Sequence, residues 1–286
     1  MERRFNDIAY VLLLGGIGMK KETLLLFCCL FYLLLLTGCE SHEITDVVYK
    51  EVRQESDIEY EKYIAHAGGS IEGVSYTNCK EAINSSYNKG YRFIELDFIS
   101  TADGNFILLH GWKDGSVKKL FNEKSKIYSL EEFKDFKMIN GWTQLSLFDL
   151  IEWLRVKKDV FIVTDAKDDN IRLLKLIKEK YGDVQHQIIP QIYYMEEYST
   201  VSELGYENII LTLYRTNYTD RKIVNFSIEN HLFAITMPKE KAGEDLVKTL
   251  NQIGVCVYIH TVNNEIEVEK YEKSGVYGFY TDILLD

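Results

Sequence analysis

Short apolar runs alternate with longer amphipathic stretches from about residue 60 onward. The short runs are rich in β-branched and aromatic residues, as strands are, and the longer ones carry apolar positions at helical spacing. This alternation is typical of a parallel α/β fold. We predict strands over 63–66, 93–98, 106–110, 160–164, 187–193, 208–213, 232–237, 255–260 and 276–280, and helices over 79–88, 146–155, 170–181, 195–204, 241–253 and 265–273.

The predicted strands are one too many for an eight-stranded α/β barrel. The stretch over residues 63–286 has the length of one such barrel or of one large α/β domain. Asp103-Gly104 is a dipeptide typical of hairpin turns. The connection from Phe98 to Phe106 is short for the crossover that joins two parallel strands. We therefore expect this region to be irregular and to lack a helix, and one predicted strand to be accessory or wrong.

A separate apolar segment precedes Cys39. Residues 23–36 are almost wholly apolar, follow Lys20 and Lys21, and lead into Leu36-Thr37-Gly38-Cys39. A short apolar core behind lysines is typical of a secretory signal and is too short to favour a stable membrane span. The ending is similar to the bacterial lipobox, which makes Cys39 the expected lipid anchor. An uncleaved signal anchor is the alternative, and it would leave the domain on the same side of the membrane.

These features predict three segments: a signal segment over 1–39, an acidic tether over 40–61 and a globular domain over 62–286. Met19 is the better start, because residues 1–18 place a second apolar stretch ahead of the lysines. The expected location is the outer face of a bacterial cell membrane, and we expect a monomer.

Charge and cysteine content exclude two classes of protein. The net charge of −11 argues against nucleic acid as a partner, since such partners require a basic face. Beyond the signal and the anchor only Cys79 and Cys256 remain, which is too few for a disulfide scaffold. We expect both to be buried free thiols, with a single bridge between them as the alternative.

Polar residues stand at the ends of several predicted strands, where α/β barrels carry their functional groups. The segments are His66-Ala67-Gly68-Gly69, Glu95-Leu96-Asp97, His110-Gly111-Trp112 and Asp165-Ala166-Lys167. Each segment alone is a weak signal, because a histidine there is often structural and an aspartate often caps a helix. The occurrence of all four segments at strand ends in one chain is a stronger indication of a functional site.

Glu95 and Asp97 are two residues apart on a strand, so their side chains point to the same face. Two inward carboxylates need a compensating cation, and Asp165 brings a third. A site with only oxygen ligands suits Mg²⁺ or Ca²⁺ and disfavours zinc. The alternative is a pair of buried salt bridges that includes Lys167.

The same residues carry a resemblance to the glycerophosphodiester phosphodiesterase family, and it spans residues 63–282. The specific early block comprises Ile64-Ala65-His66, Thr77-Asn78, Glu81-Ala82, Gly90, Glu95-Leu96-Asp97, Thr101, Asp103-Gly104 and His110. Supporting later matches are Leu145-Ser146-Leu147, Asp165-Ala166-Lys167, Thr261-Val262-Asn263, Gly275-Val276-Tyr277-Gly278 and Thr281-Asp282.

The resemblance implies a (β/α)8 TIM barrel of the phospholipase C-like phosphodiesterase type with one divalent cation, Ca²⁺ or Mg²⁺. It implies hydrolysis of glycerophosphodiesters to glycerol 3-phosphate and an alcohol. Carried over by position, His66 and His110 are the general acid and base, and Glu95, Asp97 and Asp165 are the metal ligands. Lys167, Trp112 and His260 are assigned to substrate binding.

Four positions depart from the family's pattern. Ala67 stands where the family usually has arginine after the first histidine, and Gly111 where it usually has aspartate after the second. Asp165 replaces a more common glutamate, and His260 a common aromatic residue. Two other functions therefore remain open: a phospholipase-type phosphodiesterase that acts on lipid head groups, and a non-catalytic anion-binding lipoprotein that keeps the barrel.

Overall fold

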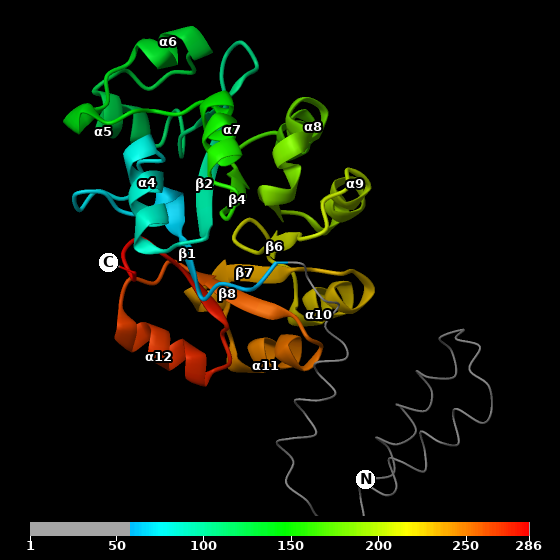
Figure 1. Cartoon of the computed structure of the whole chain (residues 1–286). Helices are drawn as coiled ribbons and strands as arrows, with labels where there is room; N and C mark the ends of the chain where they lie inside the picture. The colour runs from blue at the N-terminus through cyan, green and yellow to red at the C-terminus, as the bar shows by residue number, and fades with distance from the viewer. Residues whose placement is uncertain (1–57, 286) are drawn as a thin grey trace, which may run out of the picture. The chain divides into compact units, whose positions relative to one another are not determined.

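Strands and helices alternate along residues 58–285, the part of the chain that the computed structural model describes (Figure 1). The strands are β1 (Tyr63–Ala65), β2 (Phe93–Ser100), β3 (Phe106–Leu108), β4 (Phe161–Ala166), β5 (Ile188–Ile192), β6 (Ile210–Thr212), β7 (Ala234–Pro238), β8 (Cys256–His260) and β9 (Gly278–Thr281). The predicted signal, Cys39 and most of the predicted tether lie outside the described residues.

Eight parallel strands close into a barrel. The sheet order is β1-β9-β8-β7-β6-β5-β4-β2-β3, and an additional β1–β2 pairing joins the two ends of the parallel set. The ninth strand, β3, is antiparallel to β2, with Phe98 opposite Leu108 and Ser100 opposite Phe106. The accessory strand is therefore the one beyond the turn at Asp103-Gly104, and the predicted barrel is confirmed.

The helices pack around this barrel (Figure 1). They are α4 (Lys80–Lys89), α5 (Ser116–Phe121), α6 (Leu130–Asp135), α7 (Leu147–Val156), α8 (Asn170–Tyr181), α9 (Tyr198–Glu203), α10 (Asp220–Glu229), α11 (Glu244–Gln252) and α12 (Glu265–Lys273). The predicted helix over 195–204 is a 3-10 turn, η4 (Met195–Glu197), that continues into α9. Within residues 58–285, no helix is long and apolar enough to cross a membrane.

Three helices were not predicted. Two of them, α5 and α6, have only six residues each and are too short to show a clear helical period. The third, α10, begins after Thr219, whose side chain accepts a hydrogen bond from the Lys222 amide. That cap is a sequence signal that could have located the start of α10.

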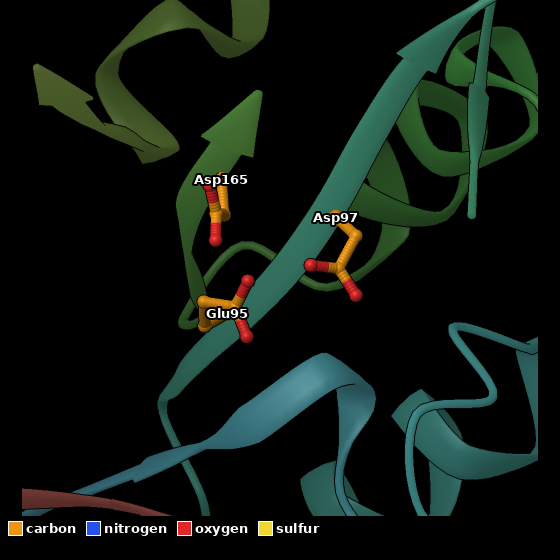
Figure 2. A group of neighbouring side chains, drawn as sticks. All are labelled: Glu95, Asp97 and Asp165. Carbon is orange, nitrogen blue, oxygen red and sulfur yellow. The ribbon is translucent and has the colours of Figure 1, made fainter. Parts of the chain in front are cut away.

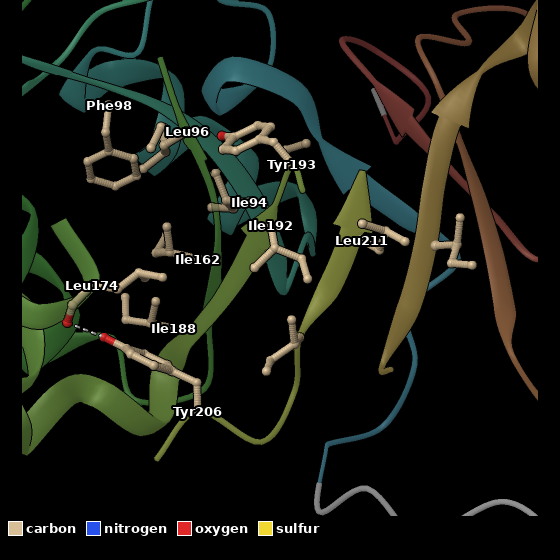
Figure 3. Packing of buried hydrophobic residues seen from close by; sticks show 14 of the residues in the cluster. Ile94, Leu96, Phe98, Ile162, Leu174, Ile188, Ile192, Tyr193, Tyr206 and Leu211 are labelled. Carbon is tan, nitrogen blue, oxygen red and sulfur yellow. Dashed lines mark hydrogen bonds between the residues drawn. The ribbon is translucent and has the colours of Figure 1, made fainter. Parts of the chain in front are cut away.

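Side chains along β2 alternate between two environments, as a strand requires. Ile94, Leu96 and Phe98 are fully buried in the layer between the barrel and its helices (Figure 3). Phe93 belongs to a separate buried cluster with Val163. Each such apolar side chain contributes about 1.5–3 kcal/mol when fully buried.

Residues within 106–142, together with two residues at the start of α4, form a second core beside the barrel. Its buried members are Cys79, Ala82, Ile107, Leu109, Trp112, Val117, Leu120, Phe121, Tyr128, Phe133, Met138 and Trp142. The cluster anchors β3 and the segment that follows it, including α5 and α6. Cys79 and Cys256 are both buried, and Cys79 is a free thiol, as predicted.

Candidate active site

Three carboxyl groups meet between neighbouring strands β2 and β4 (Figure 2). Asp97 and Asp165 are direct partners in the register of these strands, and Glu95 lies two residues before Asp97. One oxygen atom from each carboxyl group lies within 4.8 Å of the other two. The three groups converge because Glu95 and Asp97 lie on the same face of β2, and because the parallel register with β4 places Asp165 directly beside Asp97.

Lys167 neutralises part of this acidic cluster. Its Nζ lies 2.6 Å from Asp97 Oδ1 and 2.8 Å from Asp165 Oδ2. Burial alone would lower the pKa of Lys167, but the attraction of Asp97 and Asp165 outweighs it and raises the pKa. The buried salt bridges considered as an alternative are therefore present for Asp97. For Glu95 the corresponding contact is with His66, whose Nε2 lies 4.0 Å from Glu95 Oε2.

Glu95 is the carboxyl group of this cluster that has one oxygen without a hydrogen-bond partner within residues 58–285. Its Oε2 accepts a hydrogen bond of 2.7 Å from the Ala67 amide, whereas the buried Oε1 has no hydrogen-bond partner among the described residues. Burial, followed by repulsion from Asp97, raises the pKa of Glu95 to about 8. An unpartnered buried oxygen beside two other carboxyl groups fits a hard divalent cation.

Asp165 is held by groups that the sequence did not suggest. The hydroxyls of Tyr193 and Tyr214 both donate to Asp165 Oδ1, at 2.6 and 2.9 Å. Burial would raise the pKa of Asp165, but Lys167 and these hydroxyls outweigh it and lower the pKa. Arg215 stacks over the Tyr193 ring at 3.7 Å and places Nη2 3.9 Å from the same oxygen.

His66 follows β1 directly and begins a 3-10 turn, η1 (His66–Gly68). Its Nδ1 lies 3.0 Å from Asp282 Oδ1, and its Nε2 lies 4.0 Å from Glu95 Oε2. Asn263 Nδ2 donates to the second oxygen of Asp282 at 2.7 Å. Burial would lower the pKa of His66, but Asp282 and Glu95 outweigh it and raise the pKa.

Asp282 and Asn263 therefore orient His66. Both residues stood in motifs that carried the family resemblance, Thr281-Asp282 and Thr261-Val262-Asn263, but sequence reasoning gave neither a role.

His110 reaches the site through the antiparallel hairpin. The predicted strand over 106–110 ends at Leu108, so His110 lies in the loop after β3 and does not end a barrel strand. The Leu109 amide donates to the Asp97 carbonyl at 3.1 Å, which holds this loop against β2.

Tyr76 bridges the two histidines. Its ring centroid lies 4.6 Å from that of His66 and 5.4 Å from that of His110, with edge-to-face geometry in both pairs. The two imidazoles therefore lie at the same end of the barrel, each in contact with the same exposed tyrosine. Sequence reasoning did not single out Tyr76.

The two remaining predicted substrate residues differ in placement. Trp112 is 3% exposed, belongs to the second core, and donates from Nε1 to the Ser100 carbonyl at 2.7 Å. Its side chain packs in that core, and its assignment to substrate binding stays a prediction. His260 ends β8 with its ring centroid 5.9 Å from that of Tyr214. Burial, then repulsion from His66, lowers the pKa of His260 to about 4, and its role stays a prediction.

A model of the glycerophosphoryl diester phosphodiesterase family matches residues 67–284. The chain belongs to this family. The match covers the barrel from β2 onward and every predicted site residue except His66 and Cys39; β1 and His66 immediately precede it. No curated protein matches the chain significantly.

Solved structures of the family share the fold. A glycerophosphodiester phosphodiesterase from Thermotoga maritima is 19% identical with a TM-score of 0.62, over 79% of this chain and 96% of that one. A glycerophosphoryl diester phosphodiesterase from Parabacteroides distasonis is 16% identical with a TM-score of 0.61, over 84% and 89%. A phosphodiesterase from Oleispira antarctica, in complex with the product sn-glycerol-3-phosphate, is 13% identical with a TM-score of 0.60, over 78% and 93%.

Proposed function

We propose that this family member hydrolyses glycerophosphodiesters to glycerol 3-phosphate and an alcohol, with a divalent cation and two histidines. One observation carries the proposal. Two imidazoles, each with Nδ1 against an aspartate, lie at the same end of the barrel as three converging carboxyl groups. A cation site next to a paired acid and base is the equipment that hydrolysis of an anionic diester requires.

The positive charges of the site would hold the phosphate. Glu95, Asp97 and Asp165 would bind Mg²⁺ or Ca²⁺, which supplies Lewis-acid stabilisation of the negative charge that develops on the phosphoryl oxygens. Lys167 already contacts two of these carboxyl groups, so its ammonium is in place beside a phosphate bound at the same point. Arg215 adds a guanidinium on the Asp165 side, whereas the family's usual arginine is replaced by Ala67.

The histidines would move the protons. One imidazole removes the proton of the attacking hydroxyl, that of the glycerol carbon beside the phosphate, whose oxygen forms the new bond to phosphorus. The other imidazole donates a proton to the alcohol oxygen as its bond to phosphorus breaks. Water then opens the resulting cyclic phosphate, with the two proton transfers reversed, to give glycerol 3-phosphate. Because a carboxylate at Nδ1 leaves Nε2 available, each ring presents one nitrogen to the substrate, and each transfer typically contributes about 10² to 10⁴ in rate.

A substrate panel tests this proposal directly. The full chain in detergent is incubated with glycerophosphocholine, glycerophosphoethanolamine and glycerophosphoglycerol, and with the corresponding intact phospholipids, with and without Mg²⁺ or Ca²⁺. We expect glycerol 3-phosphate from the deacylated diesters only when a divalent cation is present. Cleavage of the intact lipids alone would indicate a phospholipase-type activity. Binding of the diesters without turnover under any condition would indicate a binding lipoprotein.

We also propose that Cys39 anchors the domain to the outer face of a bacterial membrane, on the support of the apolar stretch and of Leu36-Thr37-Gly38-Cys39. Cys39→Ala is expected to move the protein from the detergent phase to the aqueous phase or to stall its processing. Phase partitioning and incorporation of labelled palmitate measure this. Cys28→Ala, within the same apolar stretch, is the matched control and should partition as the parent does. A Cys39→Ala variant that stays in the detergent phase and incorporates label would contradict the anchor.

A further inference from the structure

The loop after β3 pairs His110 with a second acidic residue. His110 Nδ1 is hydrogen-bonded to Asp114 Oδ2, four residues along the chain. The Ser116 amide donates to Asp114 Oδ1 at 2.9 Å, and the Ser116 hydroxyl donates to Oδ2 at 3.0 Å. Burial would raise the pKa of Asp114, but hydrogen bonds from His110 and Ser116 outweigh it and lower the pKa. Asp114 is therefore a carboxylate that accepts from the imidazole.

Gly111 makes room for this carboxylate. A Cβ atom at position 111 would lie 2.6 Å from Asp114 Cγ and 2.7 and 2.9 Å from its two oxygens, closer than real Cβ contacts allow. The φ angle of Gly111 is outside the left-handed region, so the backbone does not demand glycine there. The absence of a side chain at position 111 is explained by the space that the Asp114 carboxylate occupies.

We propose that Asp114 is the positioning residue for His110, and that Gly111 is required because any side chain there would displace the Asp114 carboxylate. The role in turnover rests on the proposed function. In the family, aspartate usually stands directly after this histidine, at the position of Gly111. In this chain Asp114, three positions further along, places a carboxylate beside His110 instead. The arrangement parallels His66, whose Nδ1 meets Asp282.

A carboxylate at Nδ1 has two physical effects on an imidazole. It holds the neutral ring in the tautomer with the proton on Nδ1, and it stabilises the imidazolium that forms when Nε2 takes up a proton. Both effects leave Nε2 free to act on the substrate. The side chains of His110 and Asp114 are 38% and 32% exposed, so the loop geometry, more than deep burial, keeps the pair together.

A purely structural role for Asp114 makes a different prediction. Asp114 accepts from the first residue of α5, and this contact alone would stabilise the helix start. Loss of that cap would lower the melting temperature and leave the His110 tautomer unchanged. The tautomer therefore separates the two roles, and its measurement does not require a substrate.

The test is a double-mutant cycle with Asp114→Asn and Gly111→Ala. We expect Asp114→Asn to lower kcat about ten- to a hundredfold with KM changed less than about threefold, by analogy with the loss of the hydrogen-bond partner of a metal-bound histidine. Gly111→Ala should act in the same direction, because its methyl group pushes the carboxylate away. The double variant should lose no more than Asp114→Asn alone, since Gly111 acts only through Asp114.

Nitrogen-15 NMR of the full-length variants supplies the second measurement. At a pH where His110 is neutral, the parent should show the Nδ1-protonated tautomer, and both single variants should shift toward Nε2 protonation. Gly182→Ala is the matched control, because a Cβ there meets nothing within 4 Å. Unchanged tautomers in both variants, or additive losses in the cycle, would overturn the proposal. A parent that shows the expected tautomer but cleaves no diester would contradict the proposed function and leave the His110–Asp114 pairing standing.

Discussion

Replacement of His66 or of His110 by alanine is expected to lower kcat by about two to four orders of magnitude, because each change removes one of the two proton transfers. The fold should survive both changes. His110 is 38% exposed, and Asp282 keeps its hydrogen bond from Asn263 when His66 is removed. Steady-state kinetics with the best diester of the panel and a thermal melt of each variant measure the two effects.

Two further measurements sharpen this prediction. The double variant should lose less than the product of the single losses if the histidines act as a unit. The pH profile of the parent should be bell-shaped, since one ring must be neutral and the other protonated. His186→Ala is the matched control, because His186 follows α8, outside the residues assigned to the site. Near-parental kcat in both single variants would contradict the acid and base roles.

Removal of divalent cations is expected to abolish turnover and to lower the melting temperature. Loss of activity follows because Lys167 and Arg215 cannot by themselves balance three carboxyl groups and an anionic substrate. Loss of stability follows because a ligand that binds only the folded state stabilises that state. Dialysis against a chelator, followed by Mg²⁺ or Ca²⁺ addition in separate samples, measures both effects and identifies the cation that restores activity. Full activity in excess chelator would exclude the site.

The pKa of Glu95 gives this prediction a pH dependence. Without a cation, the folded-state pKa of about 8 lies above the ordinary value of 4.5, so the folded protein holds a proton that the unfolded chain releases. The stability that this proton contributes is complete below pH 4.5 and is lost as pH rises toward 8. Because a cation competes with the proton for Glu95, the increase in melting temperature on adding Mg²⁺ or Ca²⁺ should grow over the same interval.

Glu95→Gln isolates this contribution, since an amide of the same shape does not titrate. The variant should show a flatter dependence of melting temperature on pH and little stabilisation by cations. Glu81→Gln is the matched control, because Glu81 is partly exposed on α4 and accepts hydrogen bonds from Thr143, away from the carboxyl cluster. If Glu95→Gln and the parent show the same pH dependence with and without cation, the assignment of Glu95 is wrong.

The pattern along the chain was sufficient to place the barrel strands. A buried strand needs a short β-branched or aromatic run, and each of the nine predicted runs overlaps an observed strand. The two-residue period of a strand was likewise sufficient to place Glu95 and Asp97 on one face. Both inferences rest on local geometry that every strand shares.

Helix detection was less complete than strand detection, and it missed the ten-residue α10 as well as two short helices. The predicted helices correspond to α4, α7, α8, α9, α11 and α12, whereas α5 and α6 gave too few positions to show a period. These two helices pack in the second core, which forms from residues that are far apart along the chain. Burial of Trp112 depends on this packing, which the residues next to it in the sequence did not indicate.

The sequence by itself therefore determined the α/β alternation, the shared face of the acidic residues and the candidate histidines, because these depend on neighbours within a few positions. Only the tertiary structure decided which groups complete the site. Barrel closure brings Asp282 to His66 across 216 residues, and the antiparallel hairpin turns His110 back toward β2. Pairings of this kind depend on how strands and loops pack in space, which cannot be read from the residues near each position in the sequence.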